Sequence, residues 1–307
     1  MRSAVPHPGR DTAHALGRIG VWANLDRLDA AGLREFARAI ESSQSLKALW
    51  YPETIAGKEA LSLATFLLAA TERLVVATGI ASLWARDAMA AANGSRAIGE
   101  WFPGRFVLGL GVSHAPSAAT RGHSYARPFG RMQEYLDAIE RASYVGPLPP
   151  QPVPRVLAAL GPRMLRLAAE RAAGAHTYFV PLEHTALARQ ALGPEPVLAV
   201  EQAVVLARDP ATARGIARIH TRRYLAFENY LNNLRRLGWS DTDLQADGGS
   251  DALVDAIVAH GDEGIIATRV QAQLARGADH VCVQMLLADA SRAPIDELHR
   301  LDSVLLT

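Results

Sequence analysis

The chain has 307 residues, of which 32 are Lys or Arg and 31 are Asp or Glu, so its net charge is +1. A charge this close to zero indicates neither a nucleic acid nor a membrane surface as the partner, and it favours a small-molecule ligand. The length fits two ordinary domains or one large α/β domain of about 250 residues, so the pattern of elements has to decide between them.

The N-terminal residues 1–15 contain Pro, His and Arg without helical or strand periodicity, and we expect a mobile tail there. No apolar stretch has the length of a signal-peptide core or of a membrane span, so we expect a cytoplasmic protein. The single cysteine, Cys282, lies in the apolar run HVCVQMLL and is interpreted as a buried core residue rather than a nucleophile.

Eight short β-rich runs alternate with segments whose apolar residues have helical spacing. The runs cover residues 17–23, 47–52, 73–81, 105–111, 155–160, 175–180, 196–207 and 279–286. Alternating strands and helices predict a parallel sheet, and eight units favour an α/β fold of the closed (β/α)8 TIM-barrel type, with one domain over 16–307. An open doubly wound sheet is the alternative, but the run GLGVSH lacks the third glycine of a dinucleotide fingerprint.

Two segments are additional to the strands and helices of a minimal (β/α)8 barrel. Residues 146–154, GPLPPQPVP, predict an extended surface connector, because proline disfavours both helix and sheet. Residues 208–262, between the seventh and eighth strands, predict a helical insertion. Tyr224, Phe227 and Tyr230 recur in it at i, i+3 and i+6. We interpret these rings as packing against the barrel or a second subunit rather than as a substrate pocket.

Glycines mark the ends of two predicted strands, where an active site of such a barrel lies. After the fifth strand, Gly161 precedes Pro162, and proline suits a first helical turn because its missing N–H is not needed there. The free N–H groups of that turn attract anions, so we predict a phosphate site at Gly161 and Pro162, with Arg163 either assisting or solvated. In the fourth strand, Gly109 and Gly111 either admit a flat ligand or serve tight strand packing.

Four segments together resemble the luciferase-like monooxygenase superfamily: PGRFVLGLGVSHAP, ATGIASLWAR, LGPRMLRLAAERAAGA followed by YFVPLEHT, and GADHVCVQML. Within it they are most similar to the actinobacterial deazaflavin-dependent oxidoreductases that use coenzyme F-420. The resemblance runs from about Leu16 to Leu305. It implies the barrel with its long insertion, a homodimer, and a flavin or deazaflavin across the barrel mouth. It also implies a non-prolyl cis peptide bond against the ring at Gly79 and Ile80, the alternative being a plain trans bond.

A deazaflavin carries a hydride at C5, so the resemblance implies hydride transfer to or from a small organic substrate, with a proton supplied or accepted by the protein. The predicted catalytic residues are Glu53, after the second strand, and His114, where a branch of the family has a catalytic Glu. Histidine keeps a proton donor whose pKa lies near neutrality. The alternatives are an ion pair of Glu53 with Arg86 and a loop hydrogen bond of His114. Trp84 and Tyr125 are the predicted walls of the substrate pocket.

Three further side chains are less specific. His184 opens the helix after VPLE and is predicted to bind the cofactor, and His176 is the alternative for that contact. Trp50 is either a pocket wall or core. The histidine spacing is not that of zinc ligands, so we expect no metal. The first alternative function is an FMN-dependent monooxygenase on the same barrel, supplied by a separate reductase. The second, of another class, is a non-catalytic flavin-binding or structural barrel.

Overall fold

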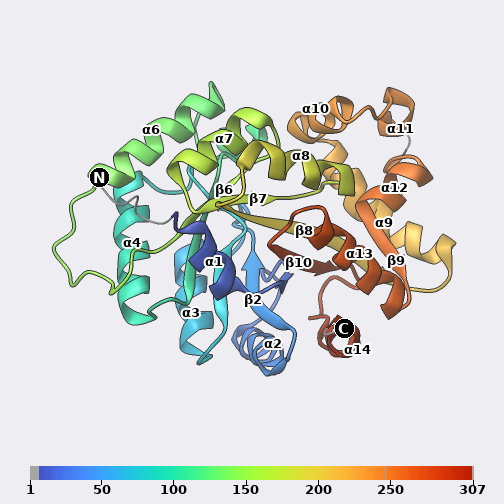
Figure 1. Cartoon of the computed structure of the whole chain (residues 1–307), viewed down its shortest axis with the longest axis horizontal. Helices are drawn as coiled ribbons and strands as arrows, with labels where there is room; N and C mark the ends of the chain where they lie inside the picture. The colour runs from blue at the N-terminus through green and yellow to red at the C-terminus, as the bar shows by residue number, and fades with distance from the viewer. Residues whose placement is uncertain (1–6, 246, 306–307) are drawn as a thin grey trace.

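The computed structural model describes residues 7–245 and 247–305 of the chain. Its centre is a barrel of parallel strands that closes because the last strand pairs with both the first and the seventh. In order around the barrel the strands are β1 (Ile19–Trp22), β2 (Leu46–Tyr51), β3 (Val75–Thr78), β5 (Phe106–Gly111), β6 (Arg155–Ala158), β7 (Gly174–Thr177), β8 (Val197–Leu206) and β10 (His280–Met285). Each of the eight predicted runs overlaps one of these strands, so the predicted TIM barrel is confirmed (Figure 1).

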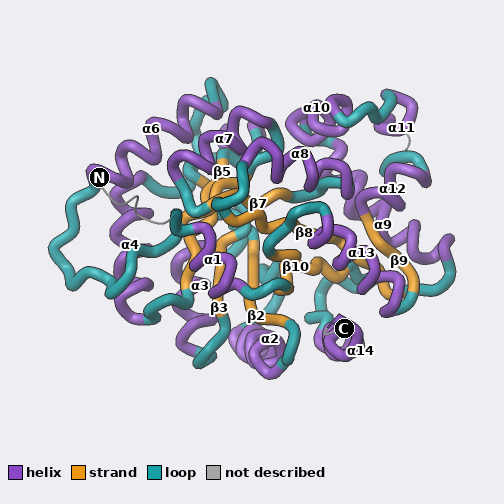
Figure 2. The backbone as a smooth tube through the Cα atoms, in the orientation of Figure 1, coloured by secondary structure: helices purple, strands orange, loops and turns teal. Residues whose placement is uncertain are grey.

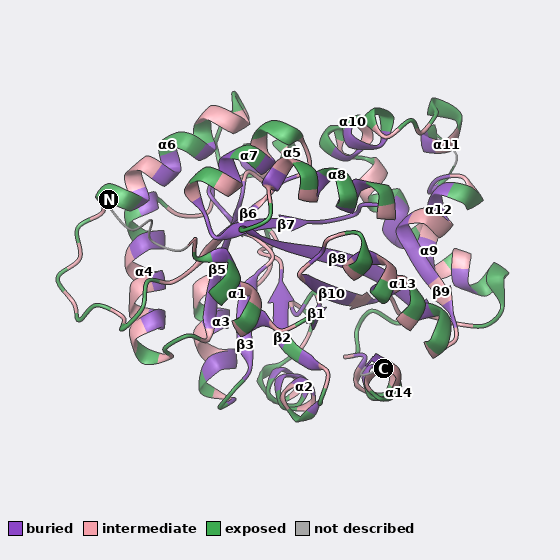
Figure 3. Cartoon of the chain, in the orientation of Figure 1, coloured by how far each residue is buried: buried purple, intermediate pink, exposed green. Residues whose placement is uncertain are grey.

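Helices surround the barrel (Figure 2). They are α2 (Ala30–Ser42), α3 (Ala60–Ala69), α4 (Ala88–Trp101), α5 (Ala115–Thr120), α6 (Pro128–Arg141), α7 (Pro162–Arg171), α8 (Leu182–Leu192), α13 (Glu263–Ala275) and α14 (Ile295–Leu305). The strands are buried almost throughout, whereas the helices alternate buried and exposed faces, as Figure 3 shows. This burial on both faces explains why the strand sequences are nearly continuous apolar runs.

The N-terminal part of the chain differs from the predicted mobile tail. Residues 9–15 are not a tail, because α1 (Gly9–Leu16) is a helix that lies against β8 and β2 and runs across the barrel in Figure 1. A Cβ on Gly9 would meet the Glu195 carbonyl oxygen at 2.4 Å, and Leu16 is fully buried. Glu195 lies just before β8, so α1 covers the N-terminal end of the barrel. Residues 1–6 of the predicted tail lie outside the described part of the chain.

The insertion after β8 contains α9 (Pro210–Leu225), α10 (Glu228–Arg236), α11 (Asp241–Gln245) and α12 (Asp251–Ile257). It is not wholly helical as predicted, because α12 gives way to β9 (Val258–Gly261), which pairs in parallel with the second half of β8. A second short strand, β4 (Ala81–Ser82), continues the path of β3 and pairs with β5. The predicted connector over 146–154 has no helix or strand.

Candidate active site

The strands end at one face of the barrel, and the residues that follow them form its mouth. His114 follows β5 and precedes α5, and its ring stacks on Phe227 with centroids 4.0 Å apart and an interplanar angle of 9°. Its Nδ1 lies 3.1 Å from Oδ1 of Asn229. Burial lowers the pKa of His114, and the positive charge of Arg223 lowers it further. The hydrogen bond to Asn229 acts in the opposite direction, but the pKa stays below its usual value. His114 is therefore neutral at neutral pH and held by the insertion.

The insertion covers the mouth with aromatic rings. Tyr178, the first residue after β7, lies within hydrogen-bond distance of the Tyr224 hydroxyl and of Gln284 Oε1, at 2.8 Å each. Its ring also lies against Trp22, at the end of β1, with centroids 4.8 Å apart. Tyr230 packs on Phe179 at 5.4 Å. The expected packing of Tyr224, Phe227 and Tyr230 against the barrel is therefore observed.

Glu53 is engaged in an ion pair. Its Oε1 lies against Nη2 of Arg86, and its Oε2 accepts a hydrogen bond of 2.8 Å from the backbone N–H of Ser82. The side chain of Glu53 is only 2% exposed. Arg86 also contacts Glu59 at 2.6 Å. This is the ion pair that was the alternative to catalysis, and it ties the end of β2 to the segment after β4.

The peptide bond between Gly79 and Ile80 is cis, as the resemblance implies. The Gly79 carbonyl oxygen accepts a 3.2 Å hydrogen bond from Nε1 of Trp22, which places this peptide beside the barrel mouth. A Cβ on Gly109 would lie 1.8 Å from the Thr78 carbonyl oxygen, and one on Gly111 would lie 2.5 Å from Cγ1 of Ile80. Strand packing therefore requires glycine at both positions, and their contact with a ligand stays a prediction.

The start of α7 forms a cationic cradle. Gly161 is its N-cap, Pro162 follows, and no side chain caps the helix. The first N–H groups of such a helix lack partners within it. A Cβ on Gly161 would lie 3.3 Å from Nη1 of Arg236, which comes from α10 in the insertion. No carboxylate forms an ion pair with Arg236 in the parts of the chain described. Helix dipole and guanidinium therefore act together on an anion at this point.

Two buried side chains support the cradle. Asn233 Oδ1 accepts a 3.0 Å hydrogen bond from Nη2 of Arg236, whereas its buried Nδ2 has no partner within residues 7–245 and 247–305. His184, on α8, lies with Nε2 2.9 Å from the carbonyl oxygen of Leu160, so it orders the residue before Gly161. Burial lowers the pKa of His184. The structure thus gives His184 a role in shaping the cradle, and direct contact with a cofactor stays a prediction.

The predicted pocket walls lie beside His114. Trp84 donates a 2.7 Å hydrogen bond to the Val112 carbonyl oxygen, and the Tyr125 hydroxyl donates one of 3.1 Å to the carbonyl oxygen of Ser113. The two rings are 6.0 Å apart. Trp50 instead is fully buried and stacks on His176 inside the barrel, with centroids 4.7 Å apart, so it is core.

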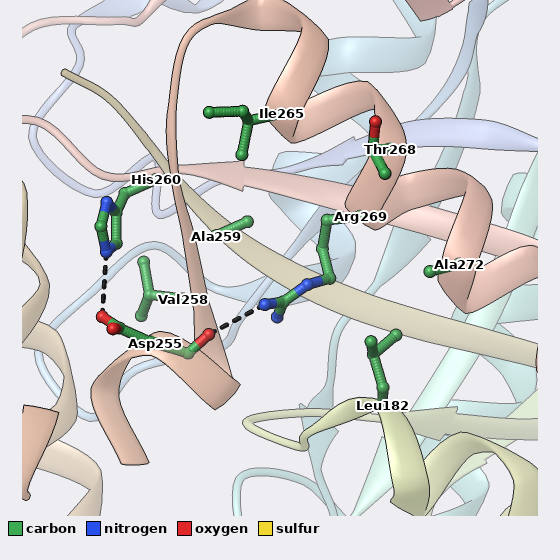
Figure 4. A pocket seen from close by; sticks show the side chains of 9 residues that line it. All are labelled: Leu182, Asp255, Val258, Ala259, His260, Ile265, Thr268, Arg269 and Ala272. Atoms are coloured by element: carbon green, nitrogen blue, oxygen red, sulfur yellow. Dashed lines mark hydrogen bonds and ion pairs between the residues drawn. The ribbon is translucent and has the colours of Figure 1, made fainter. Parts of the chain in front are cut away.

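Figure 4 shows a surface pocket of about 390 Å³ lined by residues of α12, β9 and α13 and by Leu182. None of the predicted site residues lines it. Its polar groups are already paired: Asp255 contacts His260 at 2.9 Å, and Arg269 donates to the carbonyl oxygens of Asp255 and Ala256 at 2.9 Å each. It therefore offers little to a polar ligand.

Over the described ranges, no cluster of three or more His, Cys, Asp or Glu side chains is arranged to hold a metal ion. Within the same ranges no helix is both long and apolar enough to span a membrane.

Comparison with known proteins agrees with this architecture. The model of the luciferase-like monooxygenase family matches residues 12–280, so the chain belongs to that family. No curated protein matches the sequence.

Three solved structures illustrate the shared fold. A coenzyme F-420-dependent secondary alcohol dehydrogenase, solved with a cofactor–acetone adduct, is 13% identical, with 92% of this chain and 98% of that chain covered and a TM-score of 0.72. A coenzyme F-420-dependent tetrahydromethanopterin reductase from Methanopyrus kandleri is 14% identical, with coverages of 90% and 96% and a TM-score of 0.65. The oxygenating constituent of 3,6-diketocamphane monooxygenase from Pseudomonas putida, in complex with FMN, is 16% identical, with coverages of 94% and 96% and a TM-score of 0.64. At identities this low the comparison shows a common fold alone. Two of the three structures name coenzyme F-420 and the third names FMN.

Proposed function

We propose that the protein is an oxidoreductase that binds coenzyme F-420, a deazaflavin, at the barrel mouth and transfers a hydride between its C5 atom and a small organic substrate. The observation that carries the proposal is the cationic cradle of Gly161, the α7 N-terminus and Arg236. It fits the phosphate that coenzyme F-420 and FMN both carry. Family membership supports a flavin-type cofactor, and the shared fold of two coenzyme F-420 enzymes supports the deazaflavin.

The residues that would hold the phosphate are Gly161 and Arg236, with the unpartnered Nδ2 of Asn233 as a further donor. The ring would lie toward Gly79 and Ile80, where Trp22 fixes the peptide group. When bound, the deazaflavin supplies or receives the hydride at C5.

His114 is the residue to which we assign proton transfer. The amide oxygen of Asn229 accepts a hydrogen bond, so the proton of neutral His114 is on Nδ1 and Nε2 presents a lone pair. A lowered pKa keeps that lone pair free at neutral pH, which suits acceptance of a proton from a substrate hydroxyl. Tyr125 and Trp84 order the segment that leads into His114 and wall the substrate.

Glu53 is assigned a positioning role, because both of its carboxylate oxygens are engaged by Arg86 and Ser82. Through them it fixes β4 and the segment after it against the end of β2. The resemblance also leads us to infer a homodimer, which light scattering of the purified protein tests.

Titration of the purified protein with oxidised coenzyme F-420 and, separately, with FMN tests the choice of cofactor through quenching of ligand fluorescence. Tighter binding of the deazaflavin is the expected result, and a substrate screen then follows loss of the reduced cofactor. Tighter binding of FMN would favour an oxygen-dependent monooxygenase supplied by a reductase. Binding of neither would contradict the proposal and favour a structural barrel.

A further inference from the structure

Glu201 is a carboxyl group inside the barrel, just below the mouth. It lies on β8 opposite Cys282 of β10, and its neighbour Val200 pairs with Thr177, the last residue of β7. Glu201 is therefore level with Tyr178, where β7 has ended. The side chain is 2% exposed, and its Oε2 accepts a 3.1 Å hydrogen bond from the backbone N–H of Phe179. Because Phe179 lies beyond β7, the carboxyl group leans toward the mouth.

The other oxygen of this carboxyl group is unused. Oε1 of Glu201 is buried and has no hydrogen-bond partner in the described structure, and no basic side chain there forms an ion pair with it. Burial raises the pKa of Glu201 to about 8, and the Phe179 N–H opposes that rise only in part. The group is therefore neutral at pH 7. Since Oε2 accepts from the backbone, the acidic proton is placed on Oε1, which becomes a donor without an acceptor.

The ionisable groups around Glu201 offer no counter-charge. Those that interact with it directly are Tyr178 after β7, Tyr224 on α9, Tyr230 on α10 and Cys282 on β10. Two histidines lie one residue further out: His176 is 4.0 Å from the Cys282 sulfur, and the ring of His220 is 5.7 Å from that of Phe179. Burial lowers the pKa of His176 and of His220 to about 3, so both are neutral. Burial raises the pKa of the Tyr178 and Tyr230 hydroxyls, which are neutral as well. A buried donor without a partner costs free energy, so an occupant of the mouth that accepts a hydrogen bond would relieve that cost.

We propose that Glu201 is a ligand-binding residue, whose Oε1–H donates a hydrogen bond to an uncharged acceptor, a carbonyl oxygen or ring nitrogen, of the molecule bound in the barrel mouth. The inference rests on the proposed function, since a deazaflavin and a flavin both carry such acceptors on their rings. It adds a residue from the barrel interior, just below the mouth, to a site otherwise built from the strand ends, the loops and the insertion. A ligand that takes this proton as a hydrogen bond binds only the neutral form of Glu201.

The test is the pH dependence of binding. Dissociation constants for oxidised coenzyme F-420 and for FMN are measured by fluorescence quenching from about pH 6 to about pH 10 in the wild type and in Glu201→Gln, in which an amide N–H replaces the carboxyl O–H. Comparison of the two proteins removes any titration of the ligand itself. The wild type should lose affinity by about tenfold per pH unit once Glu201 ionises, relative to Glu201→Gln. Superimposable profiles with tight binding in both proteins would overturn the inference and leave the proposed function standing.

A spectroscopic measurement on the wild type covers the case in which Glu201→Gln folds poorly. Infrared difference spectra with and without coenzyme F-420 report the carbonyl stretch of a protonated carboxyl group, which shifts when its O–H finds an acceptor. A shift on binding supports the inference, and an unmoved band contradicts it. Failure of both cofactors to bind at any pH would instead remove the proposed function and this inference with it.

Discussion

The imidazole of His114 and the ring of Phe227 stack in parallel, with centroids 4.0 Å apart, although the two residues are separated by more than a third of the chain. His114 belongs to the barrel and Phe227 to the insertion, which also contributes Asn229 to His114 Nδ1. The insertion therefore sets both the orientation and the tautomer of the proposed proton acceptor. The barrel provides the strand ends, and the insertion completes the site.

His114→Gln should lower kcat by about 100-fold, the low end of what a positioned general base contributes. The dissociation constant of the cofactor should stay within about twofold, because the phosphate cradle is elsewhere. The measurement is steady-state turnover with the best substrate of a screen, beside fluorescence titration. His299→Gln, an exposed histidine on α14, is the control. Unchanged turnover in His114→Gln would contradict proton transfer by His114 and favour the alternative, a hydrogen bond that holds the loop.

Arg223→Gln should raise the pKa of His114. Burial lowers that pKa and the guanidinium of Arg223 lowers it further, so removal of the charge acts upward. The neutral, proton-accepting form of His114 would then need a higher pH, and the rise of kcat with pH should move to higher pH. Titration of the His114 ring protons by NMR measures the change, which added salt should diminish. Arg222→Gln is the matched control, because Arg222 pairs with Asp247 at 2.6 Å. Equal pKa values of His114 in Arg223→Gln and Arg222→Gln would refute the assignment of this shift to Arg223.

Glu53→Gln should lower the free energy of unfolding by about 3 kcal/mol, since it leaves Arg86 without its buried partner. Glu59→Gln should cost less than about 1 kcal/mol, because Glu59 is 47% exposed where it meets Arg86. Urea unfolding followed by circular dichroism compares the two. Glu59 also caps α3 by accepting from the backbone N–H groups of Leu61 and Ser62, and the amide oxygen of Gln keeps an acceptor there. A larger loss in Glu59→Gln than in Glu53→Gln would contradict the assignment of the buried ion pair as the stabilising one.

Gly109→Ala should destabilise the protein by about 2–4 kcal/mol, because its Cβ would overlap the backbone oxygen of Thr78. Gly215→Ala, inside α9, should instead stabilise it by about 0.5–1 kcal/mol, since its Cβ would meet no neighbouring atom within 4 Å. Thermal unfolding of the two variants tests the contrast. If Gly109→Ala proved as stable as the wild type, β5 would have room to shift and strand packing would not require this glycine.

Periodicity alone predicts the eight barrel strands, because strands buried on both faces are continuous apolar runs. It fails for β9, whose residues Val258–Gly261 continue the apolar spacing of α12 and become a strand only because β8 extends past the barrel and offers an edge. It also fails for α1, a short polar helix whose structure depends on the closed end of the barrel for its packing. Both errors come from tertiary contacts that local sequence does not contain.

The candidate site divides in the same way. The sequence of Gly161 and Pro162 predicts an anion site, because both residues belong to the start of one helix. Arg236 is not, because 75 positions separate it from Gly161 and only the fold of the insertion brings them together. Glu201 can be found from the sequence, because it is the one acidic residue in the apolar run PVLAVEQAVVLA. A carboxyl group in such a run has to be buried at a cost in free energy, which indicates a function.

The most direct test of the cradle compares Arg236→Gln with Arg235→Gln in their dissociation constants for oxidised coenzyme F-420. Both arginines are exposed neighbours on α10, but Arg235 is paired with Asp241 at 2.9 Å, whereas Arg236 lies against Gly161. Arg236→Gln should weaken binding by about tenfold, or ~1.4 kcal/mol, and Arg235→Gln should change it by less than about twofold. Equal affinities in the two variants would contradict a phosphate site between α7 and the insertion.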